Sequence, residues 1–393
     1  MRIAIWIEQS ASGGVDTHLT SLLTNWAVLT DEIVIFTNRD NPSVDKYRRT
    51  HTNVEIKLIL VRRLRGNGYL RLICETIFLP LYIWWSSVKA KQLLDGNGDF
   101  DAFIADLGGY PASWPTLGAL RAAFKLKIVK RILLVHHQAV PRRPLLNNVE
   151  YLVDRRVLVW STSTIAVSNA TRSSLVSRRD FDLEVNAIRV IHNGVDDNAN
   201  VIKGKMRALL GLGTTMKVAA IMGRAEFYKG HEELIRAIAL MRFDIRKDFL
   251  LLVIGTIDDG YRESLEHLSK KLGVSESVRI VGFIELDSAE IIADLDLLVC
   301  ATQDFEGFGY TVLEAMIVGT PVVTTNVGAI TEYCDERFAV VARPGSIQDL
   351  VDGIESTLSD LPETMIRVSA AIKQARKYSA TNTAHEFHRE LSL

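Results

Sequence analysis

The chain has 393 residues, of which 48% are apolar and 24% are charged. A single hydrophobic core rarely serves more than about 250 to 300 residues, so this length favours two domains, and the composition excludes a disordered, collagenous or disulfide-scaffold protein. The net charge of -1 argues against a general nucleic-acid binder. Residues 1–196 hold 25 Lys and Arg against 18 Asp and Glu, whereas the remainder holds 21 against 29. We therefore expect the two halves to have different tasks.

Short β-rich apolar runs alternate with helical patterns along the chain, which is typical of parallel sheets covered by helices on both faces. In the first half, strands are expected at 2–7, 32–37, 54–60, 102–105, 130–135, 165–167 and 188–191. A polar segment at 197–213 follows and is interpreted as a linker. In the second half, strands are expected at 217–222, 249–254, 278–281, 297–299, 321–324 and 339–342. The pattern predicts an α/β protein with two Rossmann-like domains in series.

The cysteines and the N-terminus indicate the compartment. Cys74, Cys300 and Cys334 are far apart and form no C-x-x-C pair, so we interpret them as reduced thiols in the core. The N-terminal apolar run is interrupted by Glu8, which makes it too short for a signal peptide. A cytoplasmic protein is expected.

The most apolar stretch, residues 72–85, contains Glu75 and Pro80 and is shorter than the roughly 18 to 20 residues that span a bilayer. Trp84 and Trp85 end this stretch. The basic residues on its two sides are Arg62, Arg63, Arg65, Arg71, Lys89 and Lys91. This pattern fits a peripheral contact with the anionic inner face of a membrane, and it fits equally a buried crossover helix with solvated ends.

Candidate site residues are sought in the loops that follow strands, because doubly wound domains bind ligands beyond the carboxyl ends of their strands. The loop after 2–7 carries Gly13 and Gly14 into a helix, where the backbone could approach an anionic or sugar ligand. An ordinary tight turn would use the same glycines. The loop lacks G-x-G-x-x-G spacing, so a dinucleotide oxidoreductase is weakly supported.

The loop after 217–222 runs from Gly223 to Gly230 and contains Arg224 and Lys229. A guanidinium, an ammonium and the first N–H groups of the next helix could together hold a diphosphate, although exposed basic residues at a helix start are also common. The order of residues is not that of a Walker A loop, which disfavours an ATPase or a kinase.

The loop after 297–299 carries the strongest pattern. It contains Gly307, Phe308 and Gly309 and leads into a helix. Glu306 precedes the glycines and can face the reacting part of a ligand. Glu314 lies in the helix, where it can accept paired hydrogen bonds from a ribose diol while the helix N-terminus meets phosphate charge. Two solvated glutamates on an ordinary helix would not explain the low charge and high glycine content around them.

Glu306-Gly307-Phe308-Gly309, with Glu314 eight positions on, resembles the E-x7-E motif of the retaining glycosyltransferases of family 4, which have the GT-B fold. Further matches to that family cover essentially the whole chain: Gly13-Gly14, Val135-His136-His137, His192 to Asp196, Gly223-Arg224 with Lys229-Gly230, and Tyr378-Ser379-Ala380. The resemblance implies two Rossmann-like domains whose parallel sheets face each other across a cleft. Residues 1–196 would bind the acceptor, residues 197–375 would bind the donor, and residues 376–393 would form a helix that crosses back to the first domain.

The resemblance also implies roles for the residues. Arg224 and Lys229 would neutralise the leaving diphosphate, and Glu314 would hold the ribose. Glu306 would contact the donor sugar. The glycine-loop residues near the diphosphate would be Gly13, Gly14, Gly307, Phe308 and Gly309.

One of two adjacent histidines, His136 or His137, would project toward the donor sugar; His136, nearest the strand end, fits the family better. Either of them could instead be an ordinary core histidine. Tyr310 and Thr311 depart from the Leu and Pro that are frequent in the family, which would alter the packing around the donor.

No metal or other cofactor is expected. Because the leaving group is a nucleoside diphosphate, the main catalytic need is stabilisation of charge, which Arg224, Lys229 and the helix dipole could supply. Two D-x-D sequences resemble a metal-binding motif of another glycosyltransferase fold, but neither lies in a glycine loop after a clear strand. They are Asp99 with Asp101 and Asp294 with Asp296.

Together, these patterns predict a retaining, metal-independent hexosyltransferase that moves a sugar from a nucleoside-diphosphate sugar to a glycan or lipid-linked saccharide, in cell-surface polysaccharide or glycolipid synthesis. The alternatives are a relative that isomerises or hydrolyses a nucleotide sugar, and a protein that binds one without catalysis. The basic segment from Arg121 to Arg156 suits an anionic acceptor or membrane, or is a solvated face. The nucleoside, the sugar, the acceptor and the linkage are left open.

Overall fold

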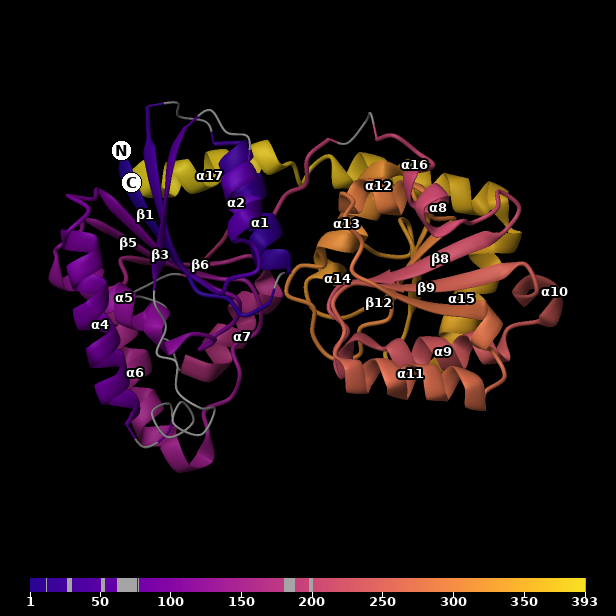
Figure 1. Cartoon of the computed structure of the whole chain (residues 1–393), viewed down its shortest axis with the longest axis horizontal. Coiled ribbons are helices and arrows are strands. Elements are labelled where there is room, and N and C mark those ends of the chain that lie inside the picture. Colours follow the sequence, from indigo (N-terminus) through magenta and orange to yellow (C-terminus); the bar gives the residue numbers. More distant parts are fainter. Residues whose placement is uncertain are drawn as a thin grey trace. The chain divides into compact units, whose positions relative to one another are not determined.

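A computed structural model describes residues 1–11, 13–26, 30–50, 54–61, 76, 78–179, 188–197 and 201–392 (Figure 1). The chain divides into two compact units, one of Met1–Gly194 with Ala380–Leu393 and the other of Val195–Ser379. Each unit contains one parallel sheet with helices around it, so the predicted α/β class is confirmed. The terminal helix that belongs with the first unit begins at Ala380, whereas the sequence placed the end of the second domain at residue 375.

The first unit contains a seven-stranded sheet of order β3-β2-β1-β4-β5-β6-β7. The strands are β1 (Arg2–Ile7), β2 (Glu32–Asn38), β3 (Glu55–Val61), β4 (Ala102–Leu107), β5 (Lys130–Val135), β6 (Ser163–Ala166) and β7 (Ile188–Val190). The central strands are apolar along almost their whole length because both faces of the sheet are covered. The order reverses between β1 and β4, so the loops after these strands lie at the switch point where such sheets bind ligands.

Helices cover both faces of this sheet. They are α1 (Gly14–Thr24), α2 (Val44–Arg49), α4 (Leu79–Asp95), α5 (Trp114–Lys125), α6 (Asn147–Trp160), α7 (Asn169–Arg179) and α17 (Ala380–Ser392). The side chain of Ser113 accepts a hydrogen bond from the N–H of Thr116 and so caps α5, whose Leu117 and Leu120 join Phe36 and Phe103 in the core.

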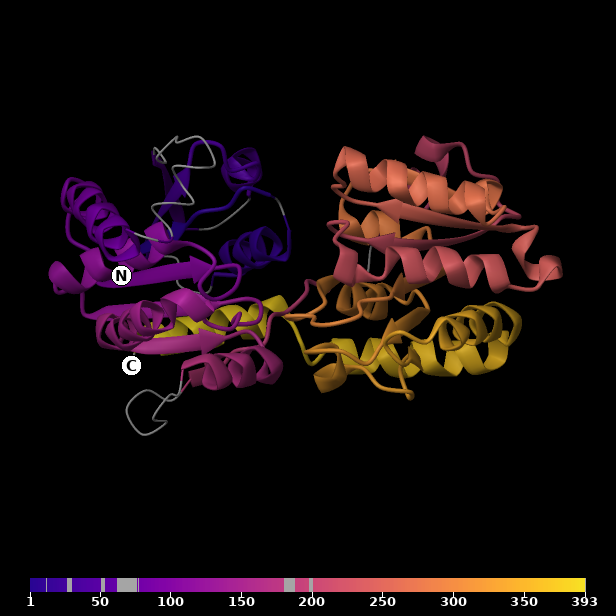
Figure 2. The ribbon, with the colours of Figure 1, turned by 90° about the horizontal axis from the view of Figure 1, so that it is seen from below.

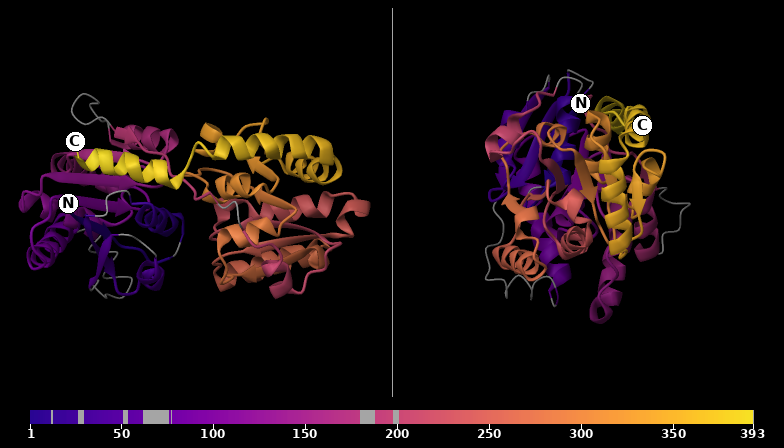
Figure 3. Two further views of the ribbon diagram at one scale, coloured as in Figure 1. Left: turned by 90° about the horizontal axis from the view of Figure 1, so that it is seen from above. Right: turned by 90° about the vertical axis from the view of Figure 1, so that its right-hand side faces the viewer.

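The C-terminal helix α17 packs on the first unit, as Figures 2 and 3 show by its yellow ribbon beside the strands and helices of that unit. Glu390 forms an ion pair with Arg189 of β7, and the Thr383 hydroxyl donates to the carbonyl of His192 at 2.9 Å. Phe387 is fully buried, with its ring centroid 5.3 Å from that of His18. The end of the chain therefore completes the core of the unit that holds its beginning.

The second unit contains a six-stranded sheet of order β10-β9-β8-β11-β12-β13. The strands are β8 (Lys217–Met222), β9 (Phe249–Ile254), β10 (Val278–Gly282), β11 (Leu297–Cys300), β12 (Val322–Thr325) and β13 (Val340–Ala342). The order reverses between β8 and β11, and the two loops that the sequence singled out in this half follow these two strands.

The helices of the second unit are α8 (Lys205–Leu210), α9 (His231–Leu240), α10 (Phe243–Arg246), α11 (Asp259–Lys271), α12 (Ser288–Ala293), α13 (Tyr310–Val318), α14 (Ile330–Tyr333), α15 (Ile347–Ser359) and α16 (Leu361–Ala375). Leu234 of α9, Leu265 of α11 and Ile354 of α15 lie in one core cluster with Leu251 and Val299 of the sheet. This cluster keeps β8 and β11 rigid beneath the loops that follow them.

Candidate functional site

Lys229 and Glu306 come from different loops and form an ion pair. The Nζ atom of Lys229 lies 2.6 Å from Oε2 of Glu306, and the two side chains are 22% and 13% exposed. Burial by itself lowers the pKa of Lys229, but the attraction of Glu306, together with smaller contributions from Tyr228 and Cys300, outweighs it, so this pKa is raised above its ordinary value. The Thr302 hydroxyl donates to the same carboxylate oxygen at 3.2 Å. The structure therefore joins one residue of the predicted diphosphate clamp to the first glutamate of the E-x7-E pattern.

A glycine makes this approach possible. Gly230 has a φ of +78°, and a Cβ atom at this position would overlap the carbonyl of Ala301 in the loop after β11. Nearby, the N–H of Gln303 donates to the carbonyl of Tyr228 at 2.7 Å. The loops after β8 and β11 are thus packed backbone against backbone, which only glycine permits at position 230.

Arg224, the other basic residue of the clamp, is placed differently. Its side chain is 47% exposed, and its guanidinium lies 3.7 Å from the carboxylate of Glu226. An exposed pair of this kind contributes little to stability, so the side chain can reorient at small cost. Lys229 is fixed in its ion pair, whereas Arg224 lies where a ligand could recruit it.

The second glutamate of the pattern, Glu314, is buried on α13. Its Oε1 atom accepts a hydrogen bond from the hydroxyl of Ser288, at the start of α12, at 2.8 Å. Sequence analysis missed Ser288, because nothing in its spacing from Glu314 indicates the contact. Phe308 is also buried, so the glycine loop can offer a ligand the backbone of this residue and not its ring.

In the first unit, Gly13 and Gly14 lie at the start of α1, as the sequence predicts. The carboxylate of Asp16 accepts a hydrogen bond from the N–H of Gly13 at 2.9 Å and another from the hydroxyl of Tyr47. Asp16 is fully buried, and that burial raises its pKa. Sequence analysis missed Asp16, although an acidic residue three positions after Gly13, inside an otherwise apolar helix face, is a usable signal for a loop-closing carboxylate.

The two adjacent histidines have different surroundings. His136 is buried, with its Nε2 atom 2.9 Å from Oδ1 of the buried Asp106, and its ring packs edge-on against His18 at a centroid distance of 4.7 Å. Burial lowers the pKa of His18 well below its ordinary value, and the neighbouring His136 lowers it further. His137 is partly exposed. Sequence analysis missed Asp106 and His18, which become neighbours of His136 only through the order of the strands.

Some arginines of the basic segment from Arg121 to Arg156 form ion pairs within the first unit. Arg142 lies 2.9 Å from Asp154 and Arg143 lies 2.5 Å from Glu150, and both carboxylates are 2% exposed. Arg178 is buried as well, 2.9 Å from Glu150. Arg142 and Arg143 are therefore engaged in internal ion pairs, and contact of the segment with an anionic acceptor or membrane stays a prediction. Its exposed basic residues are Lys125, Lys127, Arg155 and Arg156.

The helix α4 has two apolar faces. Leu79, Ile83 and Leu94 are buried, as the crossover-helix interpretation requires. The exposed large apolar residues at its start and along its outer face are Phe78, Leu81, Trp84 and Val88. The buried face fits the crossover-helix interpretation, whereas contact of the exposed face with a membrane stays a prediction.

Within the residues that the structure describes, no helix is both long enough and apolar enough to cross a bilayer. Residues 62–75 and 77, which include the arginines before the apolar stretch and Cys74, lie outside them. Cys300 and Cys334 are buried free thiols.

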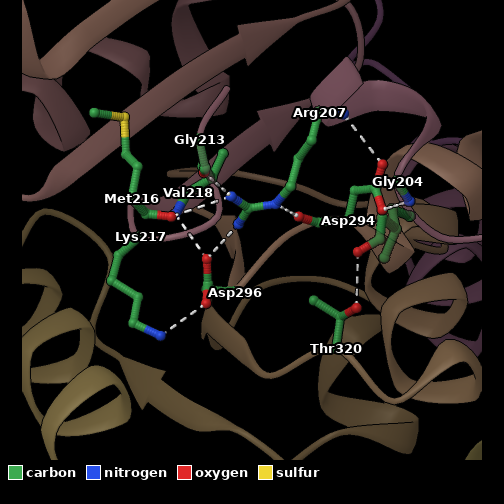
Figure 4. Close-up of polar contacts among 10 residues, drawn as sticks. Gly204, Arg207, Gly213, Met216, Lys217, Val218, Asp294, Asp296 and Thr320 are labelled. Carbon is green, nitrogen blue, oxygen red and sulfur yellow. Dashed lines mark hydrogen bonds and ion pairs between the residues drawn. The ribbon is translucent and has the colours of Figure 1, made fainter. Parts of the chain in front are cut away.

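The aspartates of the second D-x-D sequence hold α8 onto the sheet (Figure 4). The carboxylate of Asp294 accepts hydrogen bonds from the N–H groups of Met206 at 2.8 Å and of Arg207 at 3.2 Å. Asp296 receives the guanidinium of Arg207 at 2.7 Å and the ammonium of Lys217 at 3.0 Å. The two carboxylates thus cap α8 and pair with basic side chains. These structural roles account for both aspartates of this D-x-D sequence.

Comparison with known proteins places these features in a family. The family model described as Glycosyltransferase Family 4 matches residues 12–199, and the model described as Glycosyl transferases group 1 matches residues 203–377. An uncharacterized glycosyltransferase of Methanocaldococcus jannaschii is 30% identical over 234 residues, which are 58% of this chain and 58% of that protein. The lipopolysaccharide core mannosyltransferase LpsB of Rhizobium meliloti is 29% identical over 191 residues, 47% and 52% of the two chains. The matches span little more than half the length of these relatives.

Solved structures share the whole fold. HepE of Anabaena, determined in complex with UDP and glucose, has a TM-score of 0.75 at 20% identity and covers 100% of this chain and 99% of its own. WaaG, a glycosyltransferase involved in lipopolysaccharide biosynthesis, has a TM-score of 0.66 at 17% identity, covering 98% of both chains. The chain belongs to glycosyltransferase family 4, the glycosyl transferases group 1, and has the GT-B fold.

Proposed function

We propose that the protein transfers a hexose from a nucleoside-diphosphate sugar to a saccharide acceptor, with retention of anomeric configuration and without a metal ion. The observation that carries this proposal is the partly buried ion pair of Lys229 and Glu306 at the switch point of the second sheet. It places a cation beside a carboxylate at the edge where doubly wound sheets bind ligands.

The leaving diphosphate needs charge stabilisation as its bond to the sugar breaks. Lys229 would share its ammonium between Glu306 and the diphosphate, and Arg224 would turn from Glu226 toward the same oxygens. Each such charged hydrogen bond contributes about 1.5 to 3 kcal/mol. The N-terminus of α13 adds backbone N–H groups and the positive end of a helix dipole.

The two glutamates would contact different parts of the donor. Glu314, held by Ser288, would accept hydrogen bonds from the ribose hydroxyls, since a buried carboxylate is a strong acceptor for a diol. Glu306 would face the sugar. In the first unit, we propose that His137 rather than His136 reaches toward the sugar, because His136 is buried against Asp106 while His137 keeps an exposed surface.

The relatives support a choice of substrates. HepE has been solved with UDP-glucose, which supports a UDP-sugar as the first donor to test. LpsB is named for lipopolysaccharide core synthesis, which supports a glycan or lipid-linked saccharide acceptor of the cell surface. The rival functions are isomerisation or hydrolysis of a nucleotide sugar, and binding without catalysis.

We also propose a cytoplasmic location with peripheral contact at an anionic membrane. The outer face of α4 supports this, since Leu81 is 60% exposed and Trp84 is 52% exposed on one side of the helix. The exposed Lys89 and Lys91 lie on the same helix and could meet lipid phosphates. Such a contact would bring a lipid-linked acceptor to the enzyme.

The experiment that tests the proposed function is a donor screen. Thermal-shift titration with UDP, GDP, ADP and their sugars identifies the donor, and product analysis with candidate acceptors follows. The proposal expects free nucleoside diphosphate to form mainly when an acceptor is present. If free nucleoside diphosphate forms at the same rate without any acceptor, the protein is a hydrolase. If the donor binds but is not consumed with any acceptor, the protein binds a nucleotide sugar without catalysis.

A further inference from the structure

The glycine loop of the E-x7-E pattern is fastened by a tyrosine that the proposed mechanism does not use. Tyr333 is the last residue of α14 and is buried, and its hydroxyl donates toward the carbonyl oxygens of Gly309 at 2.8 Å and Phe308 at 3.0 Å. Burial raises the pKa of Tyr333 well above its ordinary value, so the hydroxyl keeps its proton. Its ring packs against that of Phe308, with centroids 5.5 Å apart.

The fit around this hydroxyl is tight. Gly309 has a φ of +85°, and a Cβ atom there would lie 2.8 Å from the Tyr333 hydroxyl and 3.3 Å from Cγ of Glu306. Next to it, the N–H of Ala329 donates to the carbonyl of Glu306 at 2.9 Å. Residues 329–333 therefore hold the loop at both ends, at Glu306 and at Gly309.

This contact fixes the direction of two peptide units. In a planar trans peptide the C=O and N–H bonds point to opposite sides. The carbonyls of Phe308 and Gly309 face Tyr333, so the N–H groups of the same units, those of Gly309 and Tyr310, face away from it. These N–H groups open α13, where an anion is stabilised by the helix dipole.

We propose that Tyr333 is a positioning residue, which sets the glycine loop so that the N–H groups of Gly309 and Tyr310 meet the donor diphosphate. The proposal rests on the proposed function, because it assigns the diphosphate to this loop. It also places Tyr333 behind the loop, where it orients the binding groups without touching the substrate.

The test compares Tyr333→Phe, which removes only the hydroxyl, with two matched variants. The ring of Tyr378 packs on that of Tyr333 at a centroid distance of 5.6 Å, and its hydroxyl donates to the carbonyl of Glu332 at 3.3 Å. Tyr378→Phe removes this hydroxyl and keeps the ring. Tyr261→Phe removes a buried hydroxyl that has no hydrogen-bond partner within the described residues.

The first readout needs no ligand. Hydrogen exchange of the free protein should become about tenfold faster in the segment that contains 309–313 in Tyr333→Phe only. Unchanged exchange there would show that the hydroxyl does not hold the loop and would overturn the proposal.

The second readout is binding by calorimetry. Tyr333→Phe should bind the matching nucleoside diphosphate about tenfold more weakly and the nucleoside itself as the wild type does. Equal losses for diphosphate and nucleoside would indicate a general structural role and overturn the positioning role. A wild-type chain that binds no nucleoside diphosphate would overturn the proposed function, and with it the ligand assigned to this loop. Intact diphosphate binding by Tyr333→Phe would overturn only the role of Tyr333.

Discussion

The ammonium of Lys229 lies 2.6 Å from the carboxylate of Glu306, so an ion pair joins the loops after β8 and β11. The attraction of Glu306 raises the pKa of Lys229, in a setting that is mostly shielded from water. In the proposed function, a diphosphate that binds beside them would compete with the carboxylate of Glu306 for the ammonium of Lys229. In this proposal, the pair is both a structural contact between loops and the place where the leaving diphosphate would be stabilised.

Removing either partner should abolish transfer without unfolding the protein. For Lys229→Ala and Glu306→Gln we expect donor turnover to fall by about 100-fold or more, as for other fixed charge-stabilising groups. Steady-state kinetics with the donor found by screening measures this. Arg337→Ala is the control, since it removes an exposed arginine of the same unit that pairs with its neighbour Asp335. Wild-type turnover in both site variants would contradict the assignment of the site.

The two histidines should separate by their phenotypes. His137→Ala should lower turnover while leaving the unfolding midpoint near that of the wild type, since its side chain is partly exposed. His136→Ala should lower the unfolding midpoint, because it creates a cavity and leaves the buried carboxylate of Asp106 without its neighbour. Urea unfolding followed by tryptophan fluorescence measures this, as all six tryptophans lie within residues 6–160. A fully stable His136→Ala variant with no turnover would restore His136 as the residue that acts on the donor.

A buried histidine next to the clamp should make the second unit sensitive to acid. Burial lowers the pKa of His231 to about 4, from an ordinary value of 6.5. The unfolded chain then takes up a proton at a higher pH than the folded one does. The free energy of unfolding is therefore not reduced by His231 above about pH 6.5, where this residue is neutral in both states. As the pH falls toward 4, protonation of the unfolded chain lowers the free energy of unfolding, by about 3 kcal/mol at most.

His231→Phe should remove this part of the acid sensitivity. Urea denaturation followed by circular dichroism at about pH 7.5 and about pH 5 compares the variant with the wild type. His267→Phe, which changes an exposed histidine of the same unit, should keep the wild-type pH dependence. If His231→Phe loses as much stability on acidification as the wild type, burial of this histidine is not a source of the effect.

The D-x-D aspartates should behave as structural residues. Asp294→Ala leaves three N–H groups at the start of α8, those of Gly204, Met206 and Arg207, without their acceptor. It should lower the free energy of unfolding by about 2 kcal/mol, as loss of a strong helix cap does. The same loss is expected with added magnesium and with a chelator. Asp99→Ala, in the other D-x-D sequence, serves as the comparison. A loss of activity in Asp294→Ala that magnesium reverses would point to a metal role instead.

The outer face of α4 should govern membrane binding. Trp84→Gln together with Leu81→Gln should reduce sedimentation with anionic liposomes at low salt, because both side chains are exposed and apolar. Val129→Gln changes another exposed apolar residue of the same unit, outside α4, and should leave binding unchanged. Wild-type protein that fails to sediment with anionic liposomes at low salt would rule out the membrane contact.

Much of the fold could be predicted from the sequence for a simple physical reason. Strands of a parallel sheet are buried on both faces and so appear as short apolar runs. Each of the thirteen expected strands is present, with ends that differ by at most two residues. The E-x7-E loop was equally accessible, because its glycines and glutamates lie close together along the chain.

What the sequence could not provide were contacts between distant segments. Two hydrogen bonds depend on strand order, which no local spacing encodes. They are those from the hydroxyl of Ser288 to Glu314 and from the hydroxyl of Tyr333 to the carbonyl of Gly309. The same holds for Arg142, which appears in the sequence as free positive charge and in the structure pairs with the buried Asp154. Charge counts along a segment therefore overestimate the charge that the surface presents.

The most direct measurement of the central claim is a calorimetric titration of the wild type and of Lys229→Ala with UDP, GDP and ADP. The account predicts that the wild type binds at least one of them and that Lys229→Ala binds it at least tenfold more weakly, because the clamp has lost its fixed cation. Binding of equal strength by both proteins, or no binding of any of the three by the wild type, would contradict it.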